Sequence, residues 1–458
     1  MTRLTVTRAF ATLGLAGLAT CTRPSNPEPV VVAIPVYNPR ADSQPPTMRR
    51  APDAPTRRPT NTPITRLGVR DVGDTTIRVL LSSKQTAVQL AAPGHIEFVD
   101  RTGNMLTSGA VSGSQPLTFR IEAEGRRVRA VRSTGATSPW TDGPITVQSG
   151  DAGLLSVGAK PYRGKIVVYA TDSGISVVNV AKIDDYLRGV VPLEIGTRSL
   201  DDSAAVQAQA ITARSYAYIH LTPNRFYDVT GGTLDQVYGG VAAESGVGSE
   251  AVESTRTLVL KYAGRIVNAP YSSTCGGRTA AASEIWRSED EPYLQSVSDE
   301  IPGTGRYYCD IAPRFRWARS LDGPQLNAAL LRYLANYVAV PAKRPGVAQS
   351  IVVGSRTTSG RVGTLVVTTD QGRFTLRGND IRYIMRQPGG EILNSTYFSV
   401  GATTGPDGAI AKLTLTGTGY GHGVGMCQWG AIGRARAGQD FRTILRTYYP
   451  GTTVGPPE

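Results

Sequence analysis

A proline-rich segment restricts where this chain can fold. Residues 22–63 contain eleven of its 30 prolines. Proline fixes φ and removes a backbone N–H, so this density disfavours helices and inner strands and favours an extended backbone. We therefore expect residues 22–63 to form a disordered, solvated tether. The folded part of the protein is expected within residues 64–458.

The residues before this tether have the pattern of an export signal. Two arginines precede an apolar stretch, residues 9–19, that is too short to span a membrane. A Leu-Ala-Thr-Cys motif ending at Cys21 resembles a bacterial lipoprotein cleavage site, although Thr stands where Gly, Ala or Ser is usual. We expect residues 1–21 to be a signal peptide and Cys21 to carry a lipid anchor in the bacterial cell envelope. Ordinary signal cleavage and a short buried helix are the alternatives.

The formal net charge of +13 is unevenly distributed. Residues 1–70 hold ten arginines and three acidic residues, so more than half of the excess lies before residue 71, outside most of the expected folded part. The chain has no Lys/Arg-rich helix, zinc finger or Gly-aromatic RNA motif, so we expect no nucleic-acid partner. A mildly basic domain is compatible with an anionic polymer such as the bacterial cell wall.

Alternating apolar and polar residues predict strands at the start of the folded part. Residues 96–99 and 117–121 have this pattern, and residues 76–81 form a short apolar run that also predicts a strand. A short Asp-Ser-Gly turn joins residues 165–169 to residues 175–180, which predicts a hairpin. With the helices expected further along, the fold class is α+β with a β-rich N-terminal part.

Helical patterns follow in the second half. An alanine-rich stretch, residues 204–221, predicts a central helix that Asp201, Asp202 or Ser203 would cap. Further patterns predict a helix over residues 325–338, strands over residues 351–354 and 364–369, and a closing helix over residues 432–449. We expect four folded parts: β-rich residues 64–180, an α+β core over 181–319, an inserted α/β segment over 320–410, and a C-terminal part of the core over 411–458.

Glu194 is the carboxylate best placed for chemistry. It stands among apolar neighbours in Val190-Val-Pro-Leu-Glu-Ile-Gly196. A desolvated carboxyl has a raised pKa and can hold a proton near neutrality, as a general acid must. A surface position in contact with water is the alternative, because most such glutamates lie on the surface.

Seven motifs in one order resemble the SpoIID/LytB family, which comprises stage II sporulation protein D and the amidase-enhancer domain. The similarity runs from about Pro161 to Thr452. The motifs are VVPLEIG at 190–196, AQAITARSYAY at 208–218, Tyr227–Thr230, Asp235–Gly240, Tyr271–Thr279, Pro292–Val297 and Gly419–Ala431.

This resemblance implies a peptidoglycan-acting envelope protein. The family's enzymes are lytic transglycosylases that cut glycan strands lacking stem peptides, and their catalytic acid corresponds to Glu194. Such an enzyme needs one carboxylate, because the nucleophile is the C6 hydroxyl of the muramic acid itself. An ordinary glycosidase needs two. The sequence shows one well-framed glutamate, which agrees with a transglycosylase that forms 1,6-anhydro ends.

The same motifs supply candidates for substrate contacts. Glycines in them let the backbone approach a ligand closely. The flanking glycines of His422 would expose its ring, and Arg278 would pair with the muramoyl carboxylate or with a local acid. The full set is Arg214, Gln236, Tyr238, Ser273, Thr274, Arg278, His422 and Gln428.

Three cysteines remain once Cys21 is assigned to the lipid. In an exported protein we expect one disulfide, Cys275–Cys309, with Cys427 left as a thiol. Cys427 lies five residues after His422, so a zinc site of three cysteines and His422 is an alternative, although no Cys-x-x-Cys spacing supports it. We expect no cofactor.

Two further functions stay open at this point. The family name also covers a non-catalytic amidase enhancer or wall-binding module, whose partners would be glycan strands and a cell-wall amidase. A cysteine-dependent peptidase that uses Cys427 and His422 is the third alternative. Involvement in sporulation does not follow from the sequence.

Overall fold

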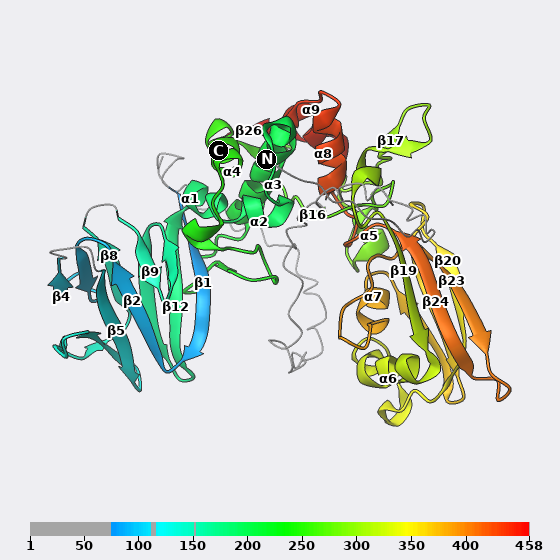
Figure 1. The fold of residues 1–458 in the computed structure, drawn as a ribbon, viewed down its shortest axis with the longest axis horizontal. Coiled ribbons are helices and arrows are strands. Elements are labelled where there is room, and N and C mark those ends of the chain that lie inside the picture. The colour runs from blue at the N-terminus through cyan, green and yellow to red at the C-terminus, as the bar shows by residue number, and fades with distance from the viewer. Residues whose placement is uncertain (1–74, 111–115, 151–152, 458) are drawn as a thin grey trace, which may run out of the picture. The chain divides into compact units, whose positions relative to one another are not determined.

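The computed structural model describes residues 75–110, 116–150 and 153–457. The expected signal peptide, Cys21 and the tether over 22–63 lie outside these residues. Within the described residues, no helix is both long and apolar enough to cross a membrane. The fold is α+β, and its N-terminal part is rich in strands, as the sequence predicts (Figure 1).

Two sheets, in which most neighbouring strands are antiparallel, form the N-terminal part. In spatial order the first is β13 (Val229–Thr230), β1 (Thr76–Gln85), β12 (Gly174–Lys182), β11 (Lys165–Thr171), β8 (Ile145–Ser149), β3 (Ile96–Val99) and β4 (Met105–Gly109). The second is β10 (Lys160–Tyr162), β9 (Leu155–Val157), β2 (Ala87–Ala92), β5 (Leu117–Glu124), β6 (Arg127–Arg132) and β7 (Thr141–Asp142).

Alternating side chains bury one face of each sheet. Ile96 and Phe98 of β3 are buried, whereas Glu97 between them is only partly covered. The rings of Phe98 on β3 and Phe119 on β5 lie 4.5 Å apart, which joins the two sheets in one hydrophobic core. The predicted hairpin is confirmed, since β11 and β12 pair from Lys165–Val180 to Thr171–Gly174.

Helices follow the first sheet. They are α1 (Ile183–Arg188), α2 (Val191–Ile195), α3 (Ser203–Ile219) and α4 (Gly246–Ser254). α3 confirms the predicted alanine-rich helix, and its Ala208, Ile211 and Ser215 are fully buried. The predicted side-chain cap is wrong, because the Asp202 carboxylate makes an ion pair with Arg436 at 2.7 Å and caps no backbone N–H.

The C-terminal region contains two helices rather than one. α8 (Gln428–Arg436) and α9 (Phe441–Tyr448) replace the single helix predicted over residues 432–449. Gly438 has φ +82°, which no helix residue adopts, and Asp440 then caps α9 by accepting from the Thr443 N–H at 2.7 Å.

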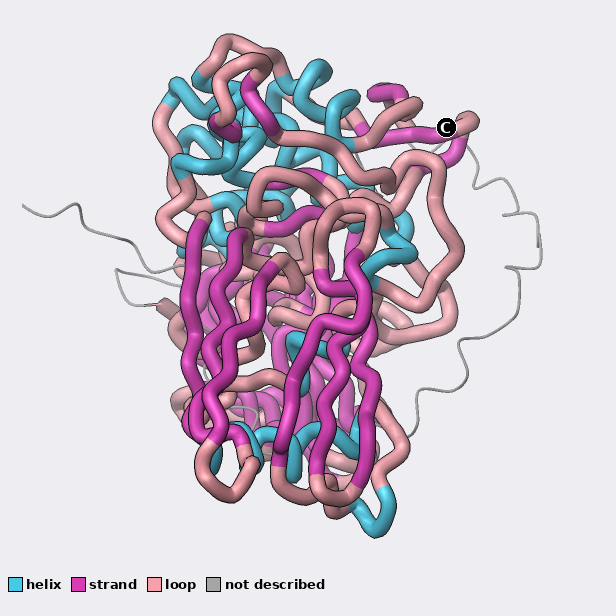
Figure 2. The backbone as a smooth tube through the Cα atoms, turned by 90° about the vertical axis from the view of Figure 1, so that its right-hand side faces the viewer, coloured by secondary structure: helices cyan, strands magenta, loops and turns pink. Residues whose placement is uncertain are grey.

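Two three-stranded sheets lie in the chain between α5 (Ala282–Ile285) and α8. Their buried side chains form a separate hydrophobic cluster, whose first and last residues in the chain are Trp317 and Leu415. Figure 2 shows their long strands running beside one another. One sheet has the order β19 (Arg316–Asp322), β24 (Ile410–Thr418), β23 (Phe398–Thr404), and the other β20 (Ala348–Arg356), β21 (Val362–Thr369), β22 (Gly372–Arg377). The helices are α6 (Gly323–Tyr333) and α7 (Asp380–Ile384). The predicted helix over residues 325–338 ends earlier, in a 3₁₀ turn at Leu334–Asn336.

Short elements complete the fold. They are β14 (Val259–Tyr262), β15 (Arg265–Ile266), β16 (Tyr271–Ser272), α5 (Ala282–Ile285), β17 (Glu300–Ile301), β18 (Arg306–Tyr307), β25 (Met426–Cys427) and β26 (Thr453–Gly455). The parallel pair β16–β25 sets Tyr271 opposite Met426 and Ser272 opposite Cys427. This pair brings the motif at 271–279 against the motif at 419–431.

Candidate active site

Glu194 lies near the end of the short helix α2. Pro192 occupies the first turn, where its missing N–H leaves no bond unmade, and Gly196 ends the helix with φ +82°. The glutamate side chain is half-buried. Its Oε1 accepts a hydrogen bond from the backbone N–H of Val237 at 3.0 Å. The carboxyl is therefore held in one orientation while part of the residue stays open to solvent.

The surroundings of Glu194 raise the pKa of its carboxyl to about 7. Desolvation is the main cause, and it outweighs hydrogen bonds from the Val237 N–H and the Tyr271 hydroxyl, both of which lower the pKa. A carboxyl with this pKa exchanges its proton near neutrality. It can act first as an acid and then as a base.

A chain of hydrogen bonds orients the Tyr271 hydroxyl. The Tyr186 hydroxyl donates to Oε1 of Gln236 at 3.2 Å. The amide nitrogen of Gln236 then faces Tyr271. That nitrogen donates to the Tyr271 oxygen at 3.1 Å. Because the Tyr271 oxygen already accepts from Gln236, its own proton is free to bind the Glu194 carboxylate.

Two further contacts fix the backbone that carries Glu194. Nε2 of Gln428 donates to the Glu194 carbonyl oxygen at 2.9 Å and to Oε1 of Gln209 at 3.2 Å. Nε of Arg198 donates to the Ile195 carbonyl at 2.7 Å, and its guanidinium lies 4.7 Å from the centre of the Trp429 ring. Gln428 and Trp429, the first two residues of α8, thereby hold α2 and the segment after it in place.

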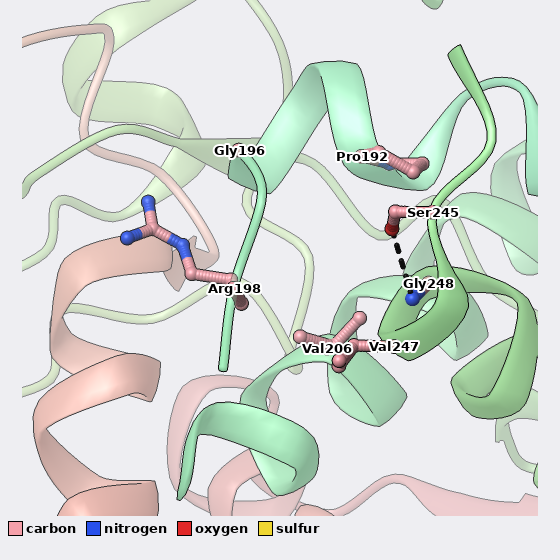
Figure 3. A pocket seen from close by; sticks show the side chains of 7 residues that line it. All are labelled: Pro192, Gly196, Arg198, Val206, Ser245, Val247 and Gly248. Carbon is pink, nitrogen blue, oxygen red and sulfur yellow. Dashed lines mark hydrogen bonds between the residues drawn. The ribbon is translucent and has the colours of Figure 1, made fainter. Parts of the chain in front are cut away.

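A small hollow lies beside α2. It is too narrow to hold a water molecule and is lined by Pro192, Gly196, Arg198, Val206, Ser245, Val247 and Gly248. In Figure 3 the Arg198 guanidinium points away from Val206 and Ser245. The Ser245 hydroxyl accepts from the Gly248 N–H at 3.1 Å, which caps α4 (Figure 3). None of the lining residues is a predicted site residue.

Arg214 has a structural role rather than the predicted substrate contact. Its side chain is 1% exposed and makes an ion pair with Asp184 at 2.9 Å. Its guanidinium also donates to the carbonyl oxygens of Val252 and Leu258, both at 3.1 Å. Arg214 thus ties α3 to α1, to α4 and to the segment after α4, and it is covered from any ligand.

Four other predicted contacts are also buried. Tyr238 is 7% exposed, and its hydroxyl donates to Asn179 at 2.9 Å, so it belongs to the core. Thr274 is 1% exposed, and its hydroxyl has no partner within the described residues. Gln236 and Gln428 are buried as well. Gln236 orients the Tyr271 hydroxyl, and Gln428 orients the Glu194 backbone, so both support the site without facing a substrate.

The remaining predicted contacts reach the surface. Arg278 is exposed, and Ser273 and His422 are half-buried. The carbonyl oxygen of Ser273 accepts from the backbone N–H of Trp429 at 3.0 Å, and the His422 ring lies 5.1 Å from the Trp286 ring. These three side chains are the candidates that could still meet a substrate.

The His422 imidazole is not suited to exchanging a proton near neutral pH. Burial, with Arg382 as a secondary cause, lowers the pKa of its imidazole to about 3. Its Nδ1 accepts from the Val424 N–H at 3.1 Å. The ring is therefore neutral at any working pH and serves as a hydrogen-bonding group.

All three remaining cysteines are free thiols in the structure, and all are buried. The Sγ atoms of Cys275 and Cys309 lie 3.6 Å apart, beyond the length of about 2.05 Å of a disulfide bond. The predicted disulfide is therefore absent from the structure, and the Cys427 thiol and the Asp299 carboxylate lie beside the two sulfurs. His422 is not in this group, and burial leaves no thiol open to a substrate, which argues against the peptidase alternative.

Sequence patterns do not indicate the roles of Tyr271, which binds Glu194, and of Asp299, which lies beside the cysteines. Tyr271 begins the motif at 271–279, but a tyrosine at a strand start is as often a core residue. Asp299 lies outside every motif, and only the fold brings it to the cysteines. The glutamines of two motifs were recognised, but as substrate contacts rather than as supports for Glu194.

Replacing Glu194 by Gln should stabilise the protein at neutral pH. The pKa of Glu194 is raised from 4.5 to about 7, so the folded state keeps a proton that the unfolded state loses, and stability falls as the pH rises between these values. The variant lacks this penalty. Its unfolding free energy should match the wild type at pH 4 and exceed it by about 1–2 kcal/mol above pH 7, allowing for solvent screening. Urea unfolding at both pH values measures the difference; an equal gain at pH 4 would contradict the raised pKa.

Two parts of the chain match known domain families. Residues 171–262 match the stage II sporulation protein family, SpoIID, and residues 305–425 match a domain of unknown function, DUF8618. The chain is 31% identical to the amidase enhancer of Bacillus subtilis over 306 residues, which covers 58% of this chain and 40% of that protein. It is 26% identical to stage II sporulation protein D of Bacillus subtilis over 356 residues, which covers 74% and 89%. The chain belongs to the SpoIID/LytB family.

An uncharacterized protein of Brachyspira hyodysenteriae is also similar, with 32% identity over 296 residues, or 64% of this chain and 72% of that protein. The SpoIID match contains Glu194 and Gln236, whereas Tyr271 lies after its end. The DUF8618 match contains Cys309 and His422. The candidate site of this family member therefore draws on segments beyond the SpoIID match.

Proposed function

We propose that this protein is an envelope enzyme that cleaves peptidoglycan glycan strands as a lytic transglycosylase. The observation that carries this proposal is a single half-buried glutamate, Glu194, whose pKa of about 7 permits both acid and base roles. The proposed substrate is glycan from which the stem peptides have been removed. Membership of the SpoIID/LytB family supports a role at the cell wall.

The proposed reaction uses Glu194 twice. Protonated Glu194 gives its proton to the glycosidic oxygen as the bond from that oxygen to C1 of the muramic acid breaks. The carboxylate that results takes the proton of the C6 hydroxyl, and the C6 oxygen bonds to C1. The products are a 1,6-anhydro end and a strand with a free hydroxyl, and Glu194 is protonated again. No water is consumed.

The surrounding groups support both steps. The Val237 N–H and the Tyr271 hydroxyl bind the carboxylate after it has given up its proton, which limits the cost of a buried negative charge. Asp235 lies two residues before Val237, the residue whose N–H binds Glu194, and its oxygens accept from the Tyr216 hydroxyl and from the Thr230 hydroxyl and N–H. It is therefore occupied and not placed as a second catalytic acid.

Tyr271→Phe should shift the pH dependence of the reaction. The Tyr271 hydrogen bond favours the carboxylate, so its loss raises the pKa of Glu194. The falling limb of kcat/KM, expected near pH 7 in the wild type, should move upward by about half a unit to one unit. Tyr169→Phe, on β11, should leave the limb in place. A limb that stays fixed in Tyr271→Phe would contradict a contact between the two groups.

Muropeptide analysis tests the proposed function. The wild-type protein is incubated with denuded glycan strands, and the products are separated and weighed by mass spectrometry. Anhydro-muramoyl ends are expected. If the wild type releases none while it still binds glycan, the enzyme proposal fails.

A non-catalytic enhancer is the second candidate function. It is favoured by the likeness to the protein named amidase enhancer. In that case the partner is a cell-wall amidase, whose rate should rise with added protein even when Glu194 is replaced by Gln. In either case we propose that Cys21 carries a lipid and that residues 22–63 let the domain reach away from the membrane.

A further inference from the structure

A second cluster of chemically reactive side chains lies apart from the Glu194 carboxylate. Cys275, Cys309, Cys427 and Asp299 each point one donor atom into a common space, and these atoms all lie within 4.8 Å of one another. All four residues are fully buried. They come from three parts of the chain, namely Cys275, the segment from Asp299 to Cys309, and Cys427, so only the tertiary fold brings them together.

The spacing of the donor atoms fits a tetrahedral metal ion. Four ligands at about 2.3 Å from a zinc ion lie about 3.8 Å from one another. The Cys275 Sγ lies 3.6 Å from the Cys309 Sγ and 3.7 Å from Oδ2 of Asp299. We propose that Cys275, Cys309, Cys427 and Asp299 bind one zinc ion as a closed structural site.

Neighbouring groups prepare the Asp299 carboxylate for this role. Its Oδ1 accepts from the Tyr448 hydroxyl at 2.7 Å and from Nε of Arg434 at 3.2 Å. These bonds hold the carboxylate so that Oδ2 faces the cysteines. Hydrogen bonds to the atoms of a ligand that do not face the metal commonly fix the orientation of that ligand.

The Cys427 sulfur is placed as a thiolate acceptor. It accepts hydrogen bonds from the backbone N–H groups of Cys275 at 3.2 Å and of Gly430 at 3.3 Å. It also caps the N-terminus of α8, where the helix dipole favours negative charge. Two N–H donors directed at one buried sulfur are what a metal-bound thiolate requires, because they offset part of its charge.

The charge of the loaded site balances. Three thiolates and one carboxylate carry four negative charges, and zinc offsets two of them. The guanidinium of Arg434 contacts Asp299 at 3.1 Å, and that of the fully buried Arg361 donates to the Cys275 carbonyl at 2.7 Å. These two cations offset the other two charges.

The donor set favours zinc over other common ions. Three sulfur ligands exclude Mg²⁺ and Ca²⁺, which require oxygen, and four protein ligands leave no open position for catalysis. The metal would join the turn at Cys275, the segment from Asp299 to Cys309, and the start of α8. Gln428 follows Cys427 and holds the Glu194 backbone, so the metal would also stabilise the candidate active site. The zinc proposal does not depend on the proposed function.

Metal analysis of the full-length protein, purified without chelators, tests the site. We expect about one zinc per chain by plasma mass spectrometry. Replacement by Co²⁺ should give the absorption bands of a tetrahedral thiolate complex. Cys309→Ser should lose most of the bound metal and lower the thermal midpoint by about 10 °C or more. Cys21→Ser removes the one cysteine outside the cluster and should leave the zinc content unchanged.

Three results would overturn the proposal. They are a Cys275–Cys309 disulfide in non-reduced peptides, an absence of zinc binding by reduced protein under titration, and full zinc content in Cys309→Ser. If Cys309→Ser does not fold, the Co²⁺ spectrum of the wild type decides alone, since a site without thiolates gives no sulfur charge-transfer band. Loss of zinc with unchanged anhydro-product formation would separate this proposal from the proposed function.

Discussion

Replacement of Glu194 by Gln should lower the rate of anhydro-muramoyl product formation by about 10³-fold or more. General acid–base catalysis contributes 10²–10⁴-fold in typical enzymes, and in this reaction one group performs both steps. Glutamine has the shape of glutamate and its carbonyl can still accept from the Val237 N–H, so the site should keep its geometry. Binding of denuded glycan should therefore stay within about twofold of the wild type.

Glu250→Gln is the matched control for this experiment. Glu250 is an exposed residue of α4, so the same chemical change should leave the rate unaltered. Initial rates from chromatography of the released products measure both variants. A Glu194→Gln protein that retains more than about a tenth of the wild-type rate would show that another group supplies the proton.

Replacement of Arg214 by Met should lower the free energy of unfolding by about 3–5 kcal/mol. The side chain is 1% exposed and supplies the hydrogen bonds that satisfy Asp184 and the carbonyl oxygens of Val252 and Leu258. Methionine fills much of the volume but leaves these acceptors without that partner, and unsatisfied buried acceptors are costly. Denaturant unfolding monitored by circular dichroism measures the loss.

Arg256→Met provides the comparison. Arg256 also faces Asp184, at 3.8 Å, but its side chain is 51% exposed. Surface pairs of this kind contribute at most about 1 kcal/mol, so the change should be small. Wild-type stability in Arg214→Met together with a raised KM would contradict the structural role and restore Arg214 as a substrate contact.

Local patterns in the sequence predicted the regular elements well. Period-two alternation predicted β3 at its observed bounds, and alanine-rich helical spacing predicted α3 within two residues. The C-terminal helix was predicted as one unit because its apolar residues keep helical spacing on both sides of Gly438. Only the backbone reveals the positive φ that ends α8 there.

The candidate site was predictable only in part, for a physical reason. Residue type and neighbours indicated Glu194, since apolar surroundings raise the pKa of a carboxyl wherever it is covered. A motif cannot show whether a polar residue meets the substrate or supports a neighbour. Gln236 and Gln428 do the second, and Arg214 is part of the core. The grouping of Asp299 with three cysteines depends on contacts between distant segments, which local patterns do not encode.

If Glu194 cleaves glycan without using water, the products contain no oxygen from the solvent, and their isotope content distinguishes this reaction from hydrolysis. The wild-type protein is incubated with denuded glycan in water enriched in ¹⁸O, and each product is weighed by mass spectrometry. We expect 1,6-anhydro ends that contain no ¹⁸O and that are not formed by the Glu194→Gln variant. Reducing ends that carry ¹⁸O would show hydrolysis and contradict cleavage without water.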